Sequence, residues 1–270
     1  MSWIVKARRP IKRLANALGY NIVPTNEFRN LLPNLCKDGS CLHYKGEIGE
    51  YYFPPDAEGD LQVRRVRQNR INDPEIVEVA KRYIYPGTTV LDLGANFGQM
   101  SIEFAKLTGP GGWVYCFEAQ KKVYEYLARN LDANRANVFP RFNAVYNEDM
   151  KILSFPEADL TKHDSYGWFG VEPKTYSALD PTVLTITIDS LACSVPISFM
   201  KVDVEGSDLF ALHGARNTIM KHRMPILFEY NQEFQEKFGT NFNDYVYFVD
   251  DIGYKFIETV LGVNYLIVPK

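Results

Sequence analysis

The stretch TVLDLGANFGQ, Thr89–Gln99, decides the fold. It runs from apolar residues into Gly94 and Gly98, and a helical pattern follows. This order predicts a strand, a tight turn and a helix N-terminus at the ligand-binding edge of a parallel sheet. The spacing lacks the G-x-G-x-x-G of a dinucleotide site, and the Asp92 carboxylate would repel a pyrophosphate.

Outward from this stretch, apolar runs alternate with helical patterns. We expect strands at 88–94, 113–119, 137–145, 182–188, 198–204, 225–230, 254–260 and 264–270, and helices at 73–84, 98–107, 121–134, 206–222 and 241–252. The alternation predicts an α/β fold with a doubly wound, mostly parallel sheet that helices cover on both faces. The last two strands have no helix between them, so we expect an antiparallel C-terminal hairpin.

The first 72 residues have a different texture. We interpret residues 1–72 as a basic N-terminal helical and hairpin extension, with the hairpin within 46–66, and residues 73–270 as the main domain. Basic residues alternate with apolar ones around Pro10. Such a segment can lie on a membrane surface, or it can dock as a helix on the domain or on a second subunit, so peripheral membrane contact and a homo-oligomer both stay open.

Composition narrows the function classes. The 33 acidic and 30 basic residues give a net charge of −3, which argues against general nucleic-acid binding. No apolar run approaches the roughly 20 residues that span a bilayer, and the first residues lack a signal-peptide core. We therefore expect a soluble, cytoplasmic protein. The four cysteines form no CxxC pair, which predicts four free thiols in a reducing compartment.

A cationic, phosphate-free nucleoside suits the glycine turn better than a dinucleotide does. S-adenosylmethionine carries a sulfonium and an ammonium group that Asp92 can attract. Glu118 ends the next strand and can accept hydrogen bonds from both ribose hydroxyls, while Asn143 and Ala144 end the third strand beside the expected adenine. The candidate cofactor-binding residues are Asp92, Gly94, Ala95, Asn96, Phe97, Gly98, Glu118, Ala119, Asn143 and Ala144.

Charged residues at the end of the strand KVDV are candidates for catalysis. Lys201, Asp203 and Glu205 follow one another at every second position, and unpaired charges at a buried strand end are costly unless they serve a function. The alternative is a structural Lys201–Asp203 pair, with Glu205 capping the next helix. Glu229 and Asn231 end the neighbouring strand. With Asp203 they offer the oxygen ligands that Mg²⁺ prefers, or they orient sugar hydroxyls.

The segment TKHDSYGWFGVEP supplies further candidates. His163 is the candidate base, because an imidazole titrates near neutral pH. Tyr166 and Trp168 can stack against a sugar ring of the substrate. Alternatively, this segment packs against the domain and His163 is simply exposed.

The runs TVLDLGANFGQMSIEFAKLTGPGGWVYCFEA, TITIDSL, FMKVDVEGSDLFALHGARNTI and PILFEYN resemble the FkbM-type methyltransferases over about residues 73–270. The KVDVEG block is the most specific part of the resemblance. It implies a Rossmann-like class I fold with a seven-stranded sheet, and O-methylation of hydroxyls on sugars, surface glycans or polyketides. The alternatives are a regulatory or scaffold protein that binds S-adenosylmethionine without catalysis, and an NAD(P)-dependent oxidoreductase.

Overall fold

The computed structural model describes Cys36 and residues 40–172, 181–191 and 193–270. Residues 36–270 form one compact unit. The basic segment expected to touch a membrane or a second subunit lies outside the described residues. Among the described residues, every helix is too short or too polar to cross a bilayer.

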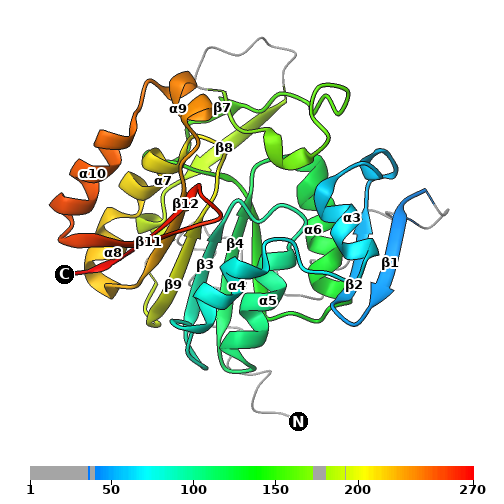
Figure 1. The fold of residues 1–270 in the computed structure, drawn as a ribbon, viewed down its shortest axis with the longest axis horizontal. Helices are drawn as coiled ribbons and strands as arrows, with labels where there is room; N and C mark the ends of the chain where they lie inside the picture. Colours follow the sequence, from blue (N-terminus) through cyan, green and yellow to red (C-terminus); the bar gives the residue numbers. More distant parts are fainter. Residues whose placement is uncertain (1–35, 37–39, 173–180, 192) are drawn as a thin grey trace. The chain divides into compact units, whose positions relative to one another are not determined.

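A seven-stranded sheet forms the centre of this unit (Figure 1). Its order is β11-β12-β10-β9-β3-β4-β5. The strands are β3 (Thr89–Leu93), β4 (Trp113–Glu118), β5 (Val138–Phe142), β9 (Ile197–Val202), β10 (Ile226–Glu229), β11 (Tyr254–Val260) and β12 (Asn264–Pro269). Only β12 runs antiparallel to its neighbours within this sheet, and its pairing with β11 confirms the expected C-terminal hairpin. β3 pairs with β4 on one side and with β9 on the other, so strand order reverses beside β3.

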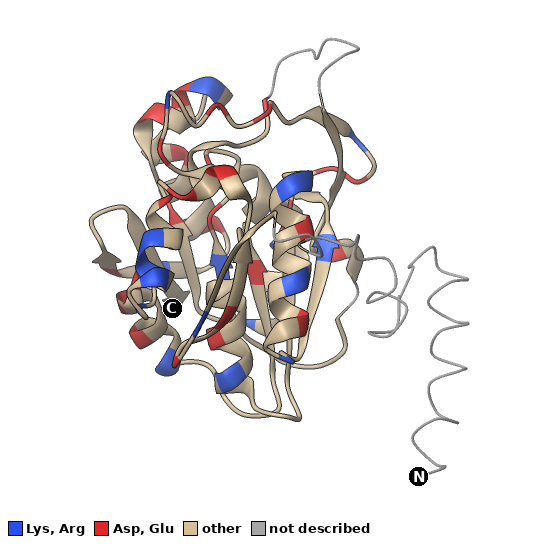
Figure 2. Cartoon of the chain, turned by 90° about the vertical axis from the view of Figure 1, so that its right-hand side faces the viewer, with Lys and Arg blue, Asp and Glu red and all other residues tan. Residues whose placement is uncertain are grey.

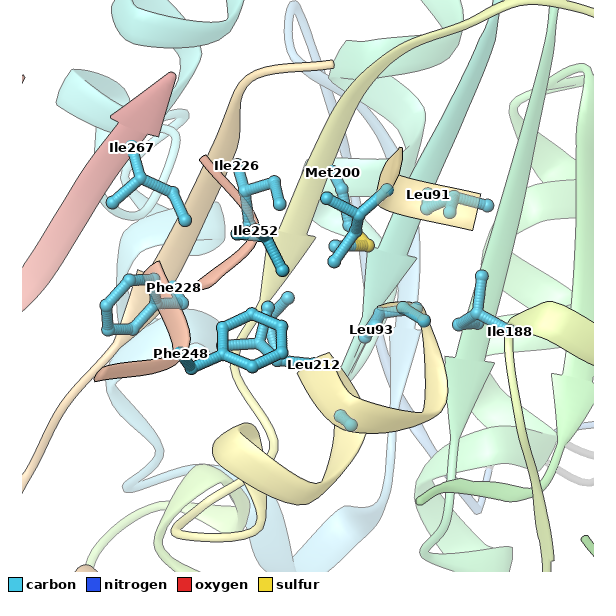
Figure 3. Close-up of a cluster of buried hydrophobic side chains, with 14 of the residues drawn as sticks. Leu91, Leu93, Ile188, Met200, Leu212, Ile226, Phe228, Phe248, Ile252 and Ile267 are labelled. Atoms are coloured by element: carbon cyan, nitrogen blue, oxygen red, sulfur yellow. The ribbon is translucent and has the colours of Figure 1, made fainter. Parts of the chain in front are cut away.

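Helices cover both faces of this sheet, as expected for a doubly wound α/β fold. On one side lie α4 (Pro74–Lys81), α5 (Gln99–Thr108) and α6 (Lys121–Ala133), and on the other lie α7 (Asp208–Gly214), α8 (Arg216–His222) and α10 (Phe242–Asp251) (Figure 1). α9 (Gln232–Phe238) follows β10. Figure 3 shows the core under the second group, where Leu91 and Met200 of the sheet face the side of Leu212 and Phe248.

Three expected elements differ from the structure. The strand expected at 182–188 is β8 (Thr182–Ile186), which pairs with β6 (Ala144–Val145) and β7 (Ile152–Ser154) in a separate sheet. Its side chains alternate between exposed and buried, as in a strand with one solvated face. The strand expected at 137–145 is divided into β5 and β6. The helix expected at 206–222 breaks into α7 and α8 at Ala215.

Among the described residues that precede α4, a hairpin packs against α6. β1 (Leu42–Gly46) and β2 (Gly49–Phe53) form a hairpin that begins before the expected 46–66 stretch, and the 3₁₀ helix η1 (Pro55–Ala57) and α3 (Leu61–Arg67) occupy the rest of it. Asn130 of α6 donates to the Tyr52 carbonyl at 3.2 Å and accepts the Tyr52 N–H at 2.7 Å. Two side-chain bonds to one residue fix the hairpin to the helix. The remaining short helices are η2 (Tyr166–Trp168) and η3 (Asp189–Leu191).

One local expectation was wrong. Cys36 and Cys41 form a disulfide, whereas Cys116 and Cys193 are free thiols as expected. Just before α4, the backbone of Asp73 is left-handed (φ 46°), and its carboxylate accepts the Asn72 side-chain amide at 2.6 Å. Figure 2 shows acidic and basic residues side by side along the helices of the face it presents, in line with the small net charge.

Candidate active site

The turn between β3 and α5 needs glycine for internal packing. Gly94 has φ +83°, and a Cβ there would lie 1.7 Å from the Asp203 carbonyl oxygen. Gly98 has φ +89°, and its Cβ would lie 2.5 Å from a methyl group of Leu127. Both positions therefore exclude a side chain on two grounds, conformation and space. The close approach at Gly94 brings the glycine turn against the end of β9.

Glu118 is held at the end of β4 by two backbone amides. One carboxylate oxygen accepts the Asn96 N–H at 2.9 Å, and the other accepts the Gln120 N–H at 2.7 Å. Glu118 is 9% exposed, and this burial raises the pKa of its carboxyl to about 7. The carboxylate thus lies between the glycine turn and the start of α6, in an orientation that the backbone sets.

A pocket opens beyond the carboxyl ends of β3, β4 and β9, beside the point where strand order reverses. Six of the ten candidate cofactor-binding residues line it: Gly94, Asn96, Glu118, Ala119, Asn143 and Ala144. Ala95, Phe97 and Gly98 lie behind the lining as buried parts of the turn. Phe97 packs edge-on against Phe53 and Tyr166, so it supports the pocket wall from behind.

Asp92 is fully buried in the middle of β3, outside the pocket lining. Its carboxylate accepts a hydrogen bond from the Ser101 hydroxyl and lies 3.8 Å from the Lys201 ammonium. Lys201 in turn donates to Asp203 at 2.8 Å. Burial by itself would lower the pKa of Lys201, but Asp203 and Asp92 outweigh it and raise the pKa. This chain of charges leads from the strand interior to the pocket, where Asp203 lies on the wall.

Three carboxylates meet at the ends of β9 and β10. Oxygens of Asp203, Glu205 and Glu229 all lie within 4.8 Å of one another, and we call these residues the carboxylate cluster. Burial, followed by the nearby negative charges, raises the pKa of Glu229 to about 9 and raises that of Glu205 well above its ordinary value. The cluster therefore binds a proton, or a cation, more readily than separate carboxylates would. Asn231 does not belong to it: its side chain accepts the Glu233 N–H and caps α9.

The segment around η2 forms a further part of the pocket wall and lies directly against Glu205, since a Cβ at Gly170 would be 2.8 Å from the Glu205 Cβ. Tyr166 lines the pocket and is 4% exposed, and Gly167, Phe169 and Gly170 line it as well. Trp168 is 41% exposed and its ring stacks on His163, with 5.4 Å between the centroids. These two rings lie outside the pocket lining, on the solvent side of the segment.

Sequence reasoning missed three residues of the site. Asp208 is 1% exposed, and its carboxylate accepts the N–H groups of Val204 and Gly206, both at 3.0 Å, which fixes the turn that carries Glu205. Its place just ahead of an apolar helical pattern was a usable signal. Gln120 lines the pocket two residues after Glu118. Asp60 precedes α3 as its cap, a signal in the sequence, but nothing there indicates its bonds to Ser165 and Tyr166.

The solved structures that are similar to this chain at low sequence identity include three methyltransferases. The methyltransferase FkbM from Methylobacillus flagellatus KT is 16% identical, with a TM-score of 0.43 over 71% of this chain and 49% of that chain. An S-adenosylmethionine-dependent O-methyltransferase from Thermotoga maritima is 12% identical, with a TM-score of 0.44 over 84% of this chain and 76% of that chain. An S-adenosylmethionine-dependent methyltransferase from Aquifex aeolicus is 15% identical, with a TM-score of 0.40 over 72% of this chain and 87% of that chain. Among curated proteins none matches the chain.

The family model of the methyltransferase FkbM domain matches residues 92–256, more than half of the chain. The matched range contains the glycine turn, Glu118 and the carboxylate cluster. The sheet order, with one antiparallel strand next to its edge, is that of a Rossmann-like class I methyltransferase. The chain belongs to the FkbM family of S-adenosylmethionine-dependent methyltransferases.

Proposed function

We propose that the protein transfers the methyl group of S-adenosylmethionine to a hydroxyl group of a sugar, a surface glycan or a glycan precursor. The observation that carries this proposal is that one pocket combines Glu118 with Asp203 and Glu205. The Glu118 carboxylate suits the hydroxyls of a ribose, and the carboxylates of Asp203 and Glu205 suit an acceptor hydroxyl that must lose a proton.

The pocket lining fits the methyl donor. Glu118 presents a carboxylate to a diol, and buried amide atoms of Asn96 and Gln120 have no hydrogen-bond partner among the described residues. Apolar side chains of Val123, Val145 and Phe155 line the same pocket and suit an adenine ring. The bound donor supplies an electrophilic methyl group on a sulfonium.

The carboxylate cluster can take the acceptor's proton. As the hydroxyl oxygen forms its bond to the methyl carbon, the carbon–sulfur electron pair goes to sulfur and the hydroxyl proton must go to a base. Glu205 lies on the pocket wall, and its raised pKa makes it a stronger base than an ordinary glutamate. Its protonated fraction falls as pH rises, so turnover should increase with pH. His163 is the second candidate base, and its ring lies on the solvent side of η2.

A sugar is the acceptor that this surface suits best. Trp168 offers an exposed ring next to pocket-lining Phe169, and aromatic faces stack on sugar rings. The carboxylates of Asp203 and Glu205 in the same pocket lining can accept hydrogen bonds from several hydroxyls. We place this activity in the cytoplasm, where nucleotide-linked sugars would be available as substrates.

A divalent cation is a second way to neutralise the cluster. Asp203, Glu205 and Glu229 supply oxygen ligands close enough for Mg²⁺, which would orient the acceptor oxygen and lower its pKa. The ammonium of Lys201 already neutralises part of this charge. Turnover that stops in a chelator and returns with added Mg²⁺ would support the cation, whereas unchanged turnover would leave the proton as the neutralising species.

The test of the function is the formation of S-adenosylhomocysteine. Purified protein is incubated with S-adenosylmethionine and a panel of sugar nucleotides and oligosaccharides, with amines and RNA as other acceptor classes. We expect turnover with a saccharide and a product that is one methylene heavier, about 14 daltons, at an oxygen. Turnover only with an amine or RNA would contradict the proposal. Donor binding without any turnover would favour the scaffold alternative, and NAD(P)H binding the oxidoreductase.

A further inference from the structure

Gln120 is a buried residue whose side chain has nothing to bind within the described protein. It is 7% exposed, and neither its amide oxygen nor its amide nitrogen has a hydrogen-bond partner among the described residues. Burying such an amide without a partner is unfavourable. The same residue belongs to the pocket lining, so a ligand that packs against it can supply the partners that the buried amide lacks.

The position of Glu118 indicates which part of a ligand Gln120 meets. One Glu118 oxygen accepts the amide N–H of Asn96, in the glycine turn, and the other accepts the N–H of Gln120. Glu118 thus lies between the glycine turn and Gln120. If it holds a ribose, the two substituents of that sugar extend to opposite sides. The turn and Asp203 take the charged amino-acid end, so the base lies toward Gln120.

Asn143, the other amide at this end of the pocket, is already in use. Its side-chain nitrogen donates to the Leu184 carbonyl at 3.1 Å. Gln120 alone of the two therefore offers a donor and an acceptor side by side. A glutamine amide can bond in this way to an adenine edge, accepting from the 6-amino group and donating to a neighbouring ring nitrogen.

We propose that the Gln120 side chain recognises the 6-amino edge of the donor's adenine and so sets the specificity for an adenosyl donor. This inference rests on the proposed function, because it assumes that the pocket binds S-adenosylmethionine. The backbone N–H of Gln120 orients Glu118, and substitution of the side chain leaves that N–H in place. The side chain can therefore be tested separately from the ribose contact.

The experiment compares two ligands by calorimetry: S-adenosylhomocysteine and its purine riboside analogue, in which hydrogen replaces the 6-amino group. The native protein should bind the analogue about tenfold more weakly, the value of one hydrogen bond. In Gln120→Met, which keeps the side-chain length without the amide, the two ligands should bind equally. Equal discrimination in both proteins would overturn the inference, as would a native protein that does not distinguish the ligands.

Folding is controlled in the same samples. Gln120→Met removes an unpartnered buried amide, so its ligand-free Tm should equal or exceed that of the native protein. Gln235→Met is the matched control, because Gln235 is 1% exposed and has an unpartnered amide nitrogen but lies outside the pocket lining. Gln235→Met should distinguish the two ligands as the native protein does. If this variant lost that discrimination, the inference would be overturned. Failure of the native protein to bind S-adenosylhomocysteine at all would instead refute the proposed function.

Discussion

The Asp60 carboxylate accepts the backbone N–H of Tyr166 at 2.9 Å, across 106 residues of sequence. The same oxygen accepts the Ser165 hydroxyl at 2.9 Å, and the other oxygen caps α3 through the Gln62 N–H. Asp60 is 1% exposed. Asp60, which precedes α4, thus holds the pocket wall in place, and this gives residues 54–67 a role in shaping the site.

We expect Asp60→Ala to destabilise the protein by about 2–4 kcal/mol, because it removes a helix cap and leaves buried donors unpaired. In the folded fraction, the KM for the acceptor should rise more than the dissociation constant of the donor, since the wall near η2 loosens. Chemical denaturation and steady-state kinetics measure the two effects. Asp164→Ala is the control: its ion pair with Arg64 is exposed, so it should cost no more than about 1 kcal/mol. Equal effects of the two substitutions would contradict the assignment.

Gly94→Ala should prevent folding or cost about 4 kcal/mol or more. The new Cβ would lie 1.7 Å from the Asp203 carbonyl, and φ is positive. Gly87 has nearly the same conformation, φ +81°, but a Cβ there meets nothing within 4 Å. Gly87→Ala should therefore cost only about 1–2 kcal/mol, from the conformation alone. The comparison of unfolding free energies isolates the close approach between the two strand ends, and similar losses at both positions would disprove it.

The turnover of two variants shows whether Glu205 or His163 is the base that takes the acceptor's proton. Glu205→Gln should lower kcat by about 10²-fold or more, with little change in donor affinity, because the amide cannot accept the hydroxyl proton. His163→Ala should lower kcat only a few-fold, since that ring lies outside the pocket lining. Rapid-quench turnover and calorimetry with S-adenosylhomocysteine give both quantities. A large loss in His163→Ala with normal turnover in Glu205→Gln would return the histidine to the role of base.

The proton on Glu229 should make the stability of the ligand-free protein fall as pH rises from about 4.5 to about 9. The native pKa of Glu229 is about 9, mainly because of burial and of Asp203, whereas an unfolded glutamate titrates near 4.5. Between these values the native state holds a proton that the unfolded chain has released, so raising the pH favours unfolding. Glu229→Gln should make the Tm less dependent on pH and should be more stable than the native protein at pH 9. Thermal denaturation in a chelator tests this, and an unchanged slope would count against the raised pKa.

Much of the sheet could be predicted from its pattern of residues. The strands β3, β4, β9 and β10 are mostly apolar runs with turn residues after them, a pattern typical of strands buried on both faces, although Asp92 interrupts β3 and Lys201 interrupts β9. Glu118, Asp203 and Glu205 were candidates because they directly follow such runs. The strand β8 was predicted as a strand; its alternating side chains indicate one solvated face, but not which sheet it joins.

Contacts between distant segments were beyond prediction from local patterns. Asp203 and Gly94 meet because β9 and β3 pair in parallel. The side chain of Asn231 caps its own helix, so the third oxygen donor beside Asp203 and Glu229 is Glu205. The Cys36–Cys41 disulfide was missed because composition does not reveal loop geometry.

The sequence by itself determined the alternation of strands and helices, the glycine turn and the family, because each depends on the order of neighbouring residues. Only the tertiary structure decided that Asp60 supports Tyr166, that Asp92 pairs inward with Ser101 and Lys201, and that Gln120 is left without a partner. The physical reason is that hydrogen bonds and burial depend on distances of a few ångströms between segments, and packing of the whole sheet and its loops sets these distances.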